Sequence, residues 1–463
     1  MKNFFFHKLF GNGHLLTNDF GNSVLLSDEE YRLFISDEVE MISKDTQEKL
    51  QKGYFLLPTP LSADCIEILQ ETTRKTKWYL FQGPVLHIFN ITNGCNYQCV
   101  YCQASATSRH PMIMPTETAK KAVHIALQSP SGRLTFEFQG GEPLLGFRTI
   151  KEIVQETKRE NQDKTITFNI VSNLSLLNND MVGFFQENHF SIATSLDGDA
   201  LLQRRNRQCK TSDSWADARE GIKKLRDAGI PVTAIQTTTK YSLTQAKEII
   251  NCYSSLGFIS IFIRPLTRLG KASADWAGIG YTAEEFLLFY RQCFFLILEK
   301  NKEGFPIKET YASILLGKIF HTSVANYMEL RSPCGAGIGQ ITYNYDGTVS
   351  TCDEGRMLAE MGNPLFQMGT VDNTLNELMR SATCRSVCAA SILESAPECF
   401  DCVYQPYCGN CPIMNYVTSQ ELFPSKPNSF RCKITKGILD LLFNCIYYGS
   451  ADYISILHAW SEE

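Results

Sequence analysis

Three cysteines, Cys95, Cys99 and Cys102, lie close together in the spacing C-x3-C-x2-C. They follow the apolar run 85–90, which we expect to form a strand. Three thiolates in such a loop can bind three irons of a four-iron cubane and leave the fourth iron without a protein ligand. That iron is then free to chelate a small molecule. The alternative is a zinc knuckle or a set of buried thiols, but zinc needs a fourth ligand and the loop offers only His110.

Glycine and polar residues follow several other expected strands. The string Gln-Gly-Gly-Glu-Pro at 139–143 ends the strand 134–139, and Ser-Leu-Asp-Gly at 195–198 ends the strand 191–196. Ligands of parallel sheets bind outside the carboxyl ends of the strands. Glycine lets a ligand approach the backbone, and a carboxylate suits an ammonium group. Taken alone, the glycine string is a turn, and Ser172-Asn173 after the third strand is equally a strand-end cap.

Together these motifs resemble those of the radical S-adenosylmethionine (SAM) superfamily. The resemblance implies that Cys95, Cys99 and Cys102 hold a four-iron cluster whose open iron binds the amino and carboxylate groups of SAM. Reduction then cleaves SAM to methionine and a 5'-deoxyadenosyl radical, which abstracts hydrogen from carbon. Residues implied to bind SAM come from the cysteine loop and from the ends of the second, fourth and sixth strands: Tyr101, Gly140, Gly141, Glu142, Ser195, Arg207 and Leu266.

The resemblance implies a particular contact with SAM for most of these residues. Tyr101 lies beside the adenine, Gly141 and Glu142 meet the methionine amino group, Ser195 contacts the ribose, and Arg207 pairs with the SAM carboxylate.

Two of the assignments have alternatives. Arg204 and Arg205 are rivals of Arg207, because all three follow the same strand. Leu266 is implied to line the adenine pocket, but an apolar residue there is more often simply part of the core.

A second group of cysteines resembles the SPASM domain of peptide-modifying radical SAM enzymes, except that Cys411 comes one residue early. Family connectivity implies two auxiliary four-iron clusters. One is complete, and the other has three cysteines and either an open iron or a non-cysteine ligand. Paired zinc sites are the alternative. The two implied ligand groups are Cys399, Cys402, Cys408 and Cys432, and Cys334, Cys352 and Cys411.

Asp353, directly after Cys352, matches a position where sulfatase-maturing relatives place a proton-accepting aspartate. A solvated turn carboxylate is the alternative interpretation.

The elements that must position these residues are predicted by alternating strand-like and helical runs. The pattern predicts an α/β fold, a partial (β/α)6 barrel over 84–305, because six strand–helix units in succession imply a parallel sheet. A linker helix over 306–333 and a metal-stapled C-terminal domain over 334–463 follow. The expected strands are 85–90, 134–139, 165–172, 191–196, 232–237 and 260–265, and the expected helices are 116–128, 147–160, 179–189, 213–228, 243–256 and 283–302.

Residues 1–75 are expected to form a separate winged-helix-like α+β module. Short strands are predicted at 4–10, 13–17 and 23–26, a capped helix starts at Ser27, and a second helix covers 46–52. In many related maturases such a module binds the leader of a precursor peptide as an added edge strand. A small cap that only packs on the barrel is the alternative.

Composition excludes several classes of protein. The net charge is −5, with 44 basic and 49 acidic residues and no basic run, so a nucleic-acid partner is not expected. The apolar segment 286–298 is interrupted by Arg291 and is too short to span a membrane. The start of the chain does not resemble a signal peptide, so we expect a cytoplasmic protein, in which metal ligation rather than disulfides explains the high count of 17 cysteines.

Longer strings, including 137–145, 343–347 and 353–362, are most similar to the radical SAM maturase of the His-Xaa-Ser system, a paired-enzyme branch. This resemblance implies hydrogen abstraction from a ribosomally made precursor peptide, leading to a crosslink or an oxidation. A second radical SAM enzyme would be a partner, and flavodoxin or ferredoxin the reductant. The alternatives are a sulfatase-type maturase that forms formylglycine and a non-catalytic iron–sulfur partner of a paired enzyme.

Overall fold

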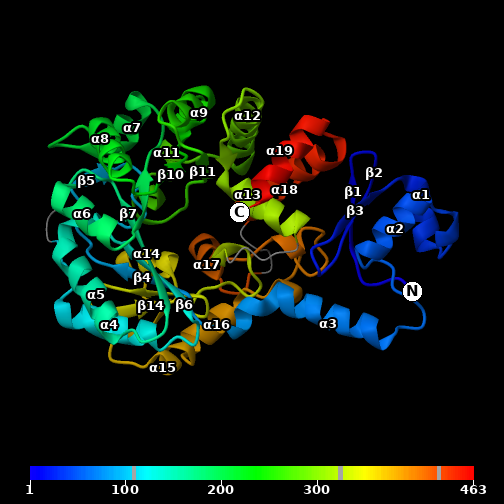
Figure 1. Cartoon of the computed structure of the whole chain (residues 1–463), viewed down its shortest axis with the longest axis horizontal. Helices are drawn as coiled ribbons and strands as arrows, with labels where there is room; N and C mark the ends of the chain where they lie inside the picture. Colours follow the sequence, from blue (N-terminus) through cyan, green and yellow to red (C-terminus); the bar gives the residue numbers. More distant parts are fainter. Residues whose placement is uncertain (107–110, 322–326, 425–428, 463) are drawn as a thin grey trace.

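The computed structural model describes residues 1–106, 111–321, 327–424 and 429–462. A strand-and-helix barrel and a C-terminal segment pack together, and the N-terminal module lies to one side of them (Figure 1). The helix α3 (Ala63–Lys77) runs from the module back towards the barrel. Within the described ranges, no helix is long and apolar enough to cross a membrane.

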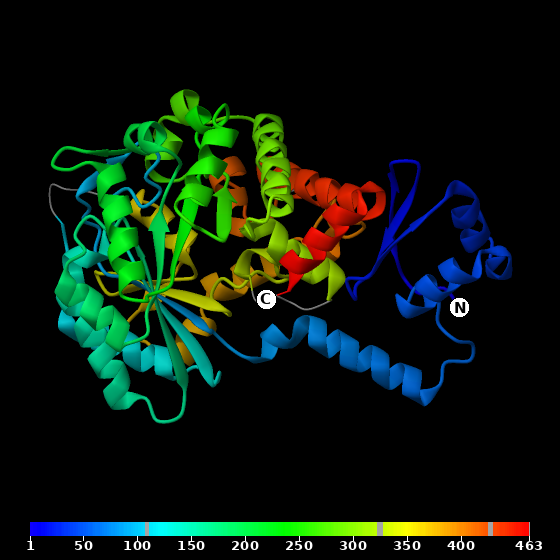
Figure 2. The ribbon, with the colours of Figure 1, turned by 45° about the horizontal axis from the view of Figure 1, so that its top comes forward.

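The barrel is a parallel sheet with helices on its outer side, as predicted. A strand occurs at each of the six expected positions: β4 (Leu86–Asn90), β6 (Arg133–Gln139), β7 (Thr165–Ser172), β8 (Ser191–Ser195), β10 (Val232–Thr237) and β11 (Ser260–Arg264). Helices follow them, and Figure 2 shows the strands fanning out beside these helices. They are α4 (Thr116–Leu127), α5 (Phe147–Glu160), α6 (Asn179–Glu187), α7 (Ala200–Asn206), α8 (Ser214–Asp227), α9 (Ala246–Ser255), α10 (Gly270–Ala274), α11 (Trp276–Ile279) and α12 (Ala283–Lys302).

The sheet continues beyond the barrel strands, which the sequence did not predict. Its order is β12-β11-β10-β8-β7-β6-β4-β13-β14-β15, with β12 (Lys308–Glu309), β13 (Gln340–Tyr343), β14 (Thr348–Ser350) and β15 (Gln367–Thr370). β13 is parallel to β4, with Ile341 opposite His87. The C-terminal segment is therefore not a separate domain at this point, because β13 pairs with the edge of β4 that would otherwise be unpaired.

The C-terminal helices also share the main apolar core. They are α13 (Thr310–Phe320), α14 (Asp353–Glu360), α15 (Leu375–Met379), α16 (Ala382–Ala390), α17 (Pro412–Ser419), α18 (Ser429–Tyr448) and α19 (Ala451–Ser461). α13 packs against α19 and β11, and α18 packs against α12. Leu315, Leu316, Leu439 and Leu442 are fully buried in the same core as the barrel strands. The expectation of a metal-stapled domain in place of a large apolar core is therefore wrong about the core, because α18 and α19 supply apolar surface.

The N-terminal module contains the three expected strands, β1 (Phe6–Phe10), β2 (Gly13–Thr17) and β3 (Ser23–Leu26), as an antiparallel sheet with β2 in the middle. The helices α1 (Asp28–Ile35) and α2 (Lys44–Lys52) follow. Ser27 and Glu30 form the capping box that starts α1. The module has its own apolar core and docks on the C-terminal segment through the ion pair Lys8–Asp440 at 2.8 Å.

Candidate active site and cysteine clusters

The cysteine loop after β4 is tied to the glycine–glutamate turn after β6. The N–H of Gly141 donates to the carbonyl of Thr92 at 2.7 Å, and the N–H of Glu142 donates to the carbonyl of Gly94 at 2.8 Å. A Cβ on Gly141 would stand 2.1 Å from the Gly94 carbonyl oxygen. The sequence suggested that this glycine admits a ligand. The structure shows that the missing side chain of Gly141 makes room for the backbone of the cysteine loop.

Most of the residues expected to bind SAM meet in one cavity of about 180 Å³ at the carboxyl ends of the strands. Its lining also includes Met357 of α14, which sequence reasoning missed because it lies far along the chain. Leu266 does not line this cavity. Its fully buried side chain borders a neighbouring cavity instead. The expected residues in the lining are Cys95, Cys99, Tyr101, Cys102, Gly140, Gly141, Glu142, Ser195 and Arg207.

His110, the histidine considered as a zinc ligand, lies outside the described residues.

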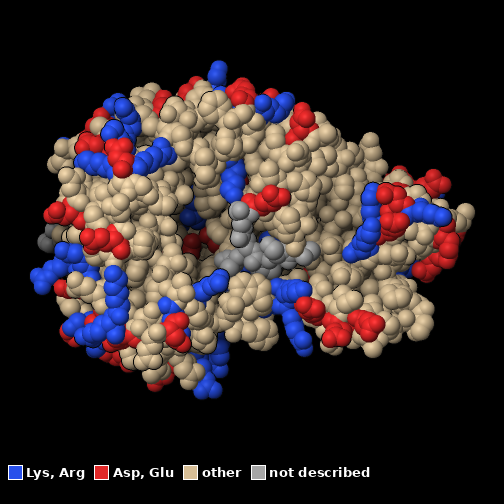
Figure 3. Space-filling model, viewed as in Figure 1, with Lys and Arg blue, Asp and Glu red and all other residues tan. Residues whose placement is uncertain are grey.

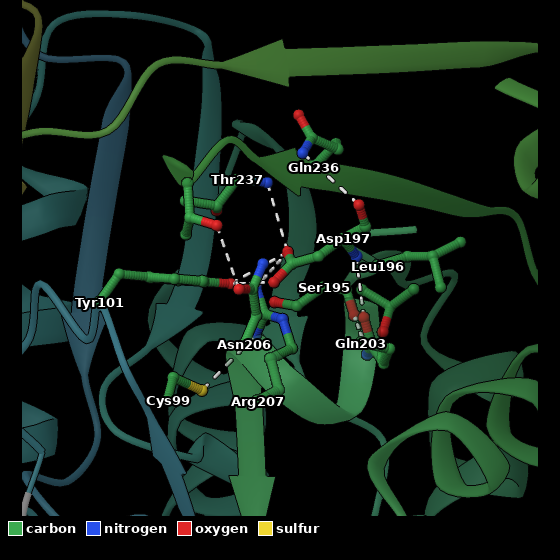
Figure 4. A network of polar contacts seen from close by, with 12 residues as sticks. Cys99, Tyr101, Ser195, Leu196, Asp197, Gln203, Asn206, Arg207, Gln236 and Thr237 are labelled. Carbon is green, nitrogen blue, oxygen red and sulfur yellow. Dashed lines mark hydrogen bonds and ion pairs between the residues drawn. The ribbon is translucent and has the colours of Figure 1, made fainter. Parts of the chain in front are cut away.

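A buried polar network fixes Arg207 (Figure 4). Asp197 is fully buried, and its carboxylate accepts the Tyr101 hydroxyl at 2.8 Å, an Nη2–H of Arg207 at 3.3 Å and the N–H of Thr237 at 3.3 Å. Burial by itself would lower the pKa of Arg207, but the Asp197 charge, the hydrogen bond to Asp197 and the nearby Tyr101 and Cys99 together outweigh burial and raise that pKa above its ordinary value. The arginine therefore presents a permanent positive charge at the cavity wall.

The rival arginines point elsewhere. Arg204 forms an exposed ion pair with Asp213 at 2.6 Å, and the Arg205 guanidinium lies over the Tyr241 ring, 3.5 Å from its centroid. Only Arg207 of the three lines the cavity.

A two-stranded sheet brings Arg207 to the cysteine loop. β5 (Tyr97–Cys99) pairs antiparallel with β9 (Arg207–Cys209), and Cys99 lies directly opposite Arg207. The arginine Nη1 is 4.0 Å from the Cys99 sulfur. The Tyr97 hydroxyl anchors the loop by donating to Asp217 at 2.6 Å. Sequence reasoning missed this sheet because three-residue strands have no detectable periodicity.

Glu142 is buried and already hydrogen-bonded by the protein. Its carboxylate accepts the Ser172 hydroxyl at 2.8 Å, the Asn173 N–H at 2.8 Å and the Leu144 N–H at 3.0 Å. Burial raises its pKa to about 7 despite these three donors. The Ser172-Asn173 pair thus orients the glutamate, and the predicted contact of Glu142 with the methionine amino group stays a prediction.

Asp353 begins α14, next to Cys352. Its Oδ1 accepts two hydrogen bonds from the buried Arg356 side chain, at 2.8 and 2.6 Å. It lines neither this cavity nor the neighbouring one. Its predicted role as a proton acceptor is untested.

The remaining predicted ligand cysteines gather in two places. Cys334, Cys352 and Cys411 lie in one buried cluster of side chains. Burial raises the pKa of the Cys352 thiol, and the other two thiols of this group raise it further. The four thiols of the other group interact with one another in the same way: Cys399, Cys402, Cys408 and Cys432. The structure therefore brings the cysteines of each predicted group together, and their role as cluster ligands stays a prediction.

The donor set fits iron–sulfur clusters. In the described part of the chain, no three Cys, His, Asp or Glu side chains come close enough to hold a single metal ion. A cubane does not require that approach, because each cysteine binds an iron at a different corner. A thiol whose pKa is raised by burial gives up its proton when iron binds.

A second cavity of about 220 Å³ adjoins the first and shares Gln103 with it. It lies between the end of β11 and the helices α17 and α18. Its walls are aromatic, with Trp276, Tyr327 and Phe430, and its charged groups include Arg264 and Glu354. Figure 3, viewed from the same side as Figure 1, shows a hollow near the centre of the molecule with charged side chains in it.

Comparisons with known proteins agree with the geometry. Residues 89–249 match the family model of the Radical SAM superfamily. An uncharacterized protein of Methanocaldococcus jannaschii is 28% identical over 178 residues, 38% of this chain and 60% of that protein. An uncharacterized protein of Methanothermobacter thermautotrophicus is 30% identical over 202 residues, 42% of this chain and 73% of that protein. A cysteine-type anaerobic sulfatase-maturating enzyme of Clostridium perfringens is 23% identical over 279 residues, 57% of this chain and 72% of that enzyme.

Two solved structures share the fold. Native anSMEcpe with bound AdoMet and Kp18Cys peptide has a TM-score of 0.68 at 18% identity, covering 81% of this chain and all of that one. Streptococcus suis SuiB bound to precursor peptide SuiA has a TM-score of 0.55 at 14% identity, covering 91% of this chain and 98% of that one. With the cysteine loop and the family match, we conclude that this chain is an enzyme of the radical SAM superfamily, with SAM and iron–sulfur clusters as cofactors.

Proposed function

We propose that this enzyme modifies a peptide after its synthesis by abstracting hydrogen from one of its residues. A single observation carries the proposal: Cys95, Cys99 and Cys102 share one cavity with Glu142 and Arg207. The cysteine thiolates would hold the cluster, and SAM bound to it supplies the hydrogen-abstracting chemistry. The polar walls would hold SAM in one orientation.

The chain's own residues have separate tasks in this proposal. Arg207 pairs with the SAM carboxylate, and Asp197 keeps the guanidinium in place. Glu142 accepts a hydrogen bond from the methionine amino group through the oxygen lone pairs its three protein donors leave free. Ser195 contacts the ribose. Tyr101, fixed by Asp197, lies beside the adenine.

The peptide would occupy the second cavity. This cavity is lined by aromatic and charged side chains and shares Gln103 with the SAM cavity, so a residue bound there lies next to the reacting carbon. Both structural relatives named above were solved with a peptide.

We further propose that the substrate is a ribosomally made precursor peptide, as in the His-Xaa-Ser system. Its leader would add to an edge strand of the N-terminal sheet, β1 or β3.

The two outer cysteine groups would hold auxiliary clusters that accept or supply an electron. Within the proposal, the enzyme works in the cytoplasm with flavodoxin or ferredoxin as reductant and with a second radical SAM enzyme as partner.

A second candidate function is favoured by the named relatives, which include sulfatase-maturating enzymes. Such an enzyme oxidises a Cys or Ser side chain to formylglycine, and Asp353 would accept the proton. For a cysteine substrate, product mass separates the two functions, because a crosslink removes two hydrogens whereas conversion of CH2SH to the CHO of formylglycine also exchanges sulfur for oxygen. For a serine substrate both reactions remove two hydrogens, so the aldehyde is detected instead by its reaction with a hydrazine, which a crosslink does not undergo.

The experiment is anaerobic. The protein is reconstituted with iron and sulfide, supplied with SAM and dithionite, and 5'-deoxyadenosine is measured by chromatography. We expect it from the unaltered chain and not from the variant Cys95→Ala/Cys99→Ala/Cys102→Ala. A matched control, Cys65→Ala, removes a cysteine of α3 outside all three groups and should retain the activity. If the unaltered chain binds its clusters but releases no 5'-deoxyadenosine, the proposal is wrong.

A further inference from the structure

The two outer cysteine groups differ in the number of thiols. Cys399, Cys402, Cys408 and Cys432 can satisfy all four irons of a cubane, whereas Cys334, Cys352 and Cys411 can satisfy three. Residues 335–340 after Cys334 contain no further cysteine. The fourth iron of the three-cysteine group therefore needs a ligand of another kind or stays open.

Glu354 is the carboxylate best placed to reach it. Cys352 is the N-cap of α14, where its sulfur accepts the Gly355 N–H at 3.4 Å, and Glu354 lies in the first turn of this helix. Leu358 of the same helix packs in the buried cluster that contains Cys334, Cys352 and Cys411. Glu354 lies four residues before Leu358, on the same face of α14, and so on the side of the helix that faces these three cysteines.

The neighbouring carboxylates are already engaged. Asp353 accepts two hydrogen bonds from Arg356, and Glu329 accepts one from Arg264 at 3.3 Å as well as pairing with a second arginine. Among the described side chains, none donates a hydrogen bond to Glu354 or pairs with it within 4.0 Å. Its own backbone N–H is the hydrogen-bond donor recorded for it, and a partly buried carboxylate satisfied only in this way is costly unless it binds a cation.

The other thiols nearby are engaged with each other. Cys384 and Cys388 lie one helical turn apart on α16, and each thiol shifts the pKa of the other. A Cβ on Gly337 would stand 2.7 Å from the Cys384 sulfur, so this thiol packs against the loop after Cys334.

We infer that the Glu354 carboxylate is the fourth protein ligand of the cluster held by Cys334, Cys352 and Cys411. An oxygen ligand is harder than a thiolate and exchanges more readily, so this iron could bind a peptide group in its place. Glu354 also lines the second cavity, where the proposed function places the substrate. The inference rests on the auxiliary clusters of the proposed function but not on its peptide chemistry.

The test uses the full chain with Cys95→Ala/Cys99→Ala/Cys102→Ala as the parent, so that only auxiliary clusters remain. Glu354→Ala, Glu354→Cys and the control Glu360→Ala are made in this parent. Glu360 lies at the other end of α14 and accepts the Tyr345 hydroxyl. Each protein is reconstituted, assayed for iron and reduced, and electron paramagnetic resonance spectra are recorded with and without millimolar 2-mercaptoethanol, a thiol that binds an open iron.

We expect about eight irons in the parent, four for each of two clusters. The thiol should shift the spectrum of Glu354→Ala at a lower concentration than that of the parent or Glu360→Ala, where it must displace the carboxylate, and should not shift that of Glu354→Cys. Loss of about four irons in Glu354→Ala, with recovery in Glu354→Cys, also supports ligation.

Three results overturn the inference. The first is a response of the parent to the thiol at the same concentration as Glu354→Ala, which shows an open iron. The second is a Glu354→Ala spectrum that matches the parent with and without the thiol. The third is a parent that holds only about four irons, which removes the three-cysteine cluster itself. Production of 5'-deoxyadenosine by the unaltered chain is measured separately, so failure here and failure of the proposed function are distinguishable.

Discussion

Replacing Asp197 by asparagine tests whether the buried network positions Arg207. The variant keeps the size of the side chain and an oxygen that can accept the Tyr101 hydroxyl, but removes the negative charge. Asp197 is fully buried, and the Arg207 side chain is only 9% exposed, so little water can replace the lost partner. The Cys99 sulfur, 4.0 Å away, does not neutralise the guanidinium in the cluster-free protein, because burial raises the pKa of this thiol to about 12 and keeps it protonated.

The expected loss in the free energy of unfolding follows from this burial. Removing one partner of a buried ion pair typically costs about 3–5 kcal/mol, because the other charge is left unpaired. The exposed pair Arg204–Asp213 provides the matched control, since water and salt screen such pairs and they contribute little to stability. We therefore expect Asp197→Asn to lower the free energy of unfolding by about 3 kcal/mol or more, and Arg204→Gln to lower it far less.

The assay is urea unfolding of the cluster-free protein, followed by circular dichroism under identical conditions for all variants. The double variant Asp197→Asn/Arg207→Gln should recover about 1–3 kcal/mol relative to the sum of the single changes, because it leaves no unpaired charge. If Asp197→Asn costs no more than Arg204→Gln, or if the double variant shows no recovery, the ion pair does not hold the arginine.

Other predictions concern the turn, the buried glutamate and a buried lysine. Gly141→Ala should abolish cluster binding by the cysteine loop, measured as iron content, because its Cβ would stand 2.1 Å from a backbone oxygen; Gly132→Ala, with open space around it, should retain the iron. Glu142 has its pKa raised to about 7, so the folded state holds its proton more tightly than the unfolded state. Stability of the cluster-free protein should therefore decrease by up to about 3 kcal/mol as pH rises from about 4.5 to about 7, and Glu142→Gln should remove that part of the pH dependence in urea unfolding. Lys318 is buried, which lowers its pKa to about 7, so its cost to stability grows as pH falls from about 10.5 to about 7. Lys318→Met should stabilise the cluster-free protein more at pH 7 than at pH 9.5 in the same assay, and an equal effect at both pH values would contradict the assignment.

The sequence alone determined the features that depend on local spacing. The C-x3-C-x2-C loop needs only neighbouring residues, and the strand–helix alternation from β4 to β11 follows from the periodicity of each segment. The division of the outer cysteines into two groups followed from the resemblance and agrees with the structure.

Only the tertiary structure decided which distant side chains meet. It selected Arg207 over Arg204 because pairing between β5 and β9 and the charge of Asp197 act across the fold. It joined β13 to β4, and it placed Met357 in the SAM cavity. These outcomes depend on contacts between residues far apart in the chain, which periodicity and spacing cannot report because they describe only one segment at a time.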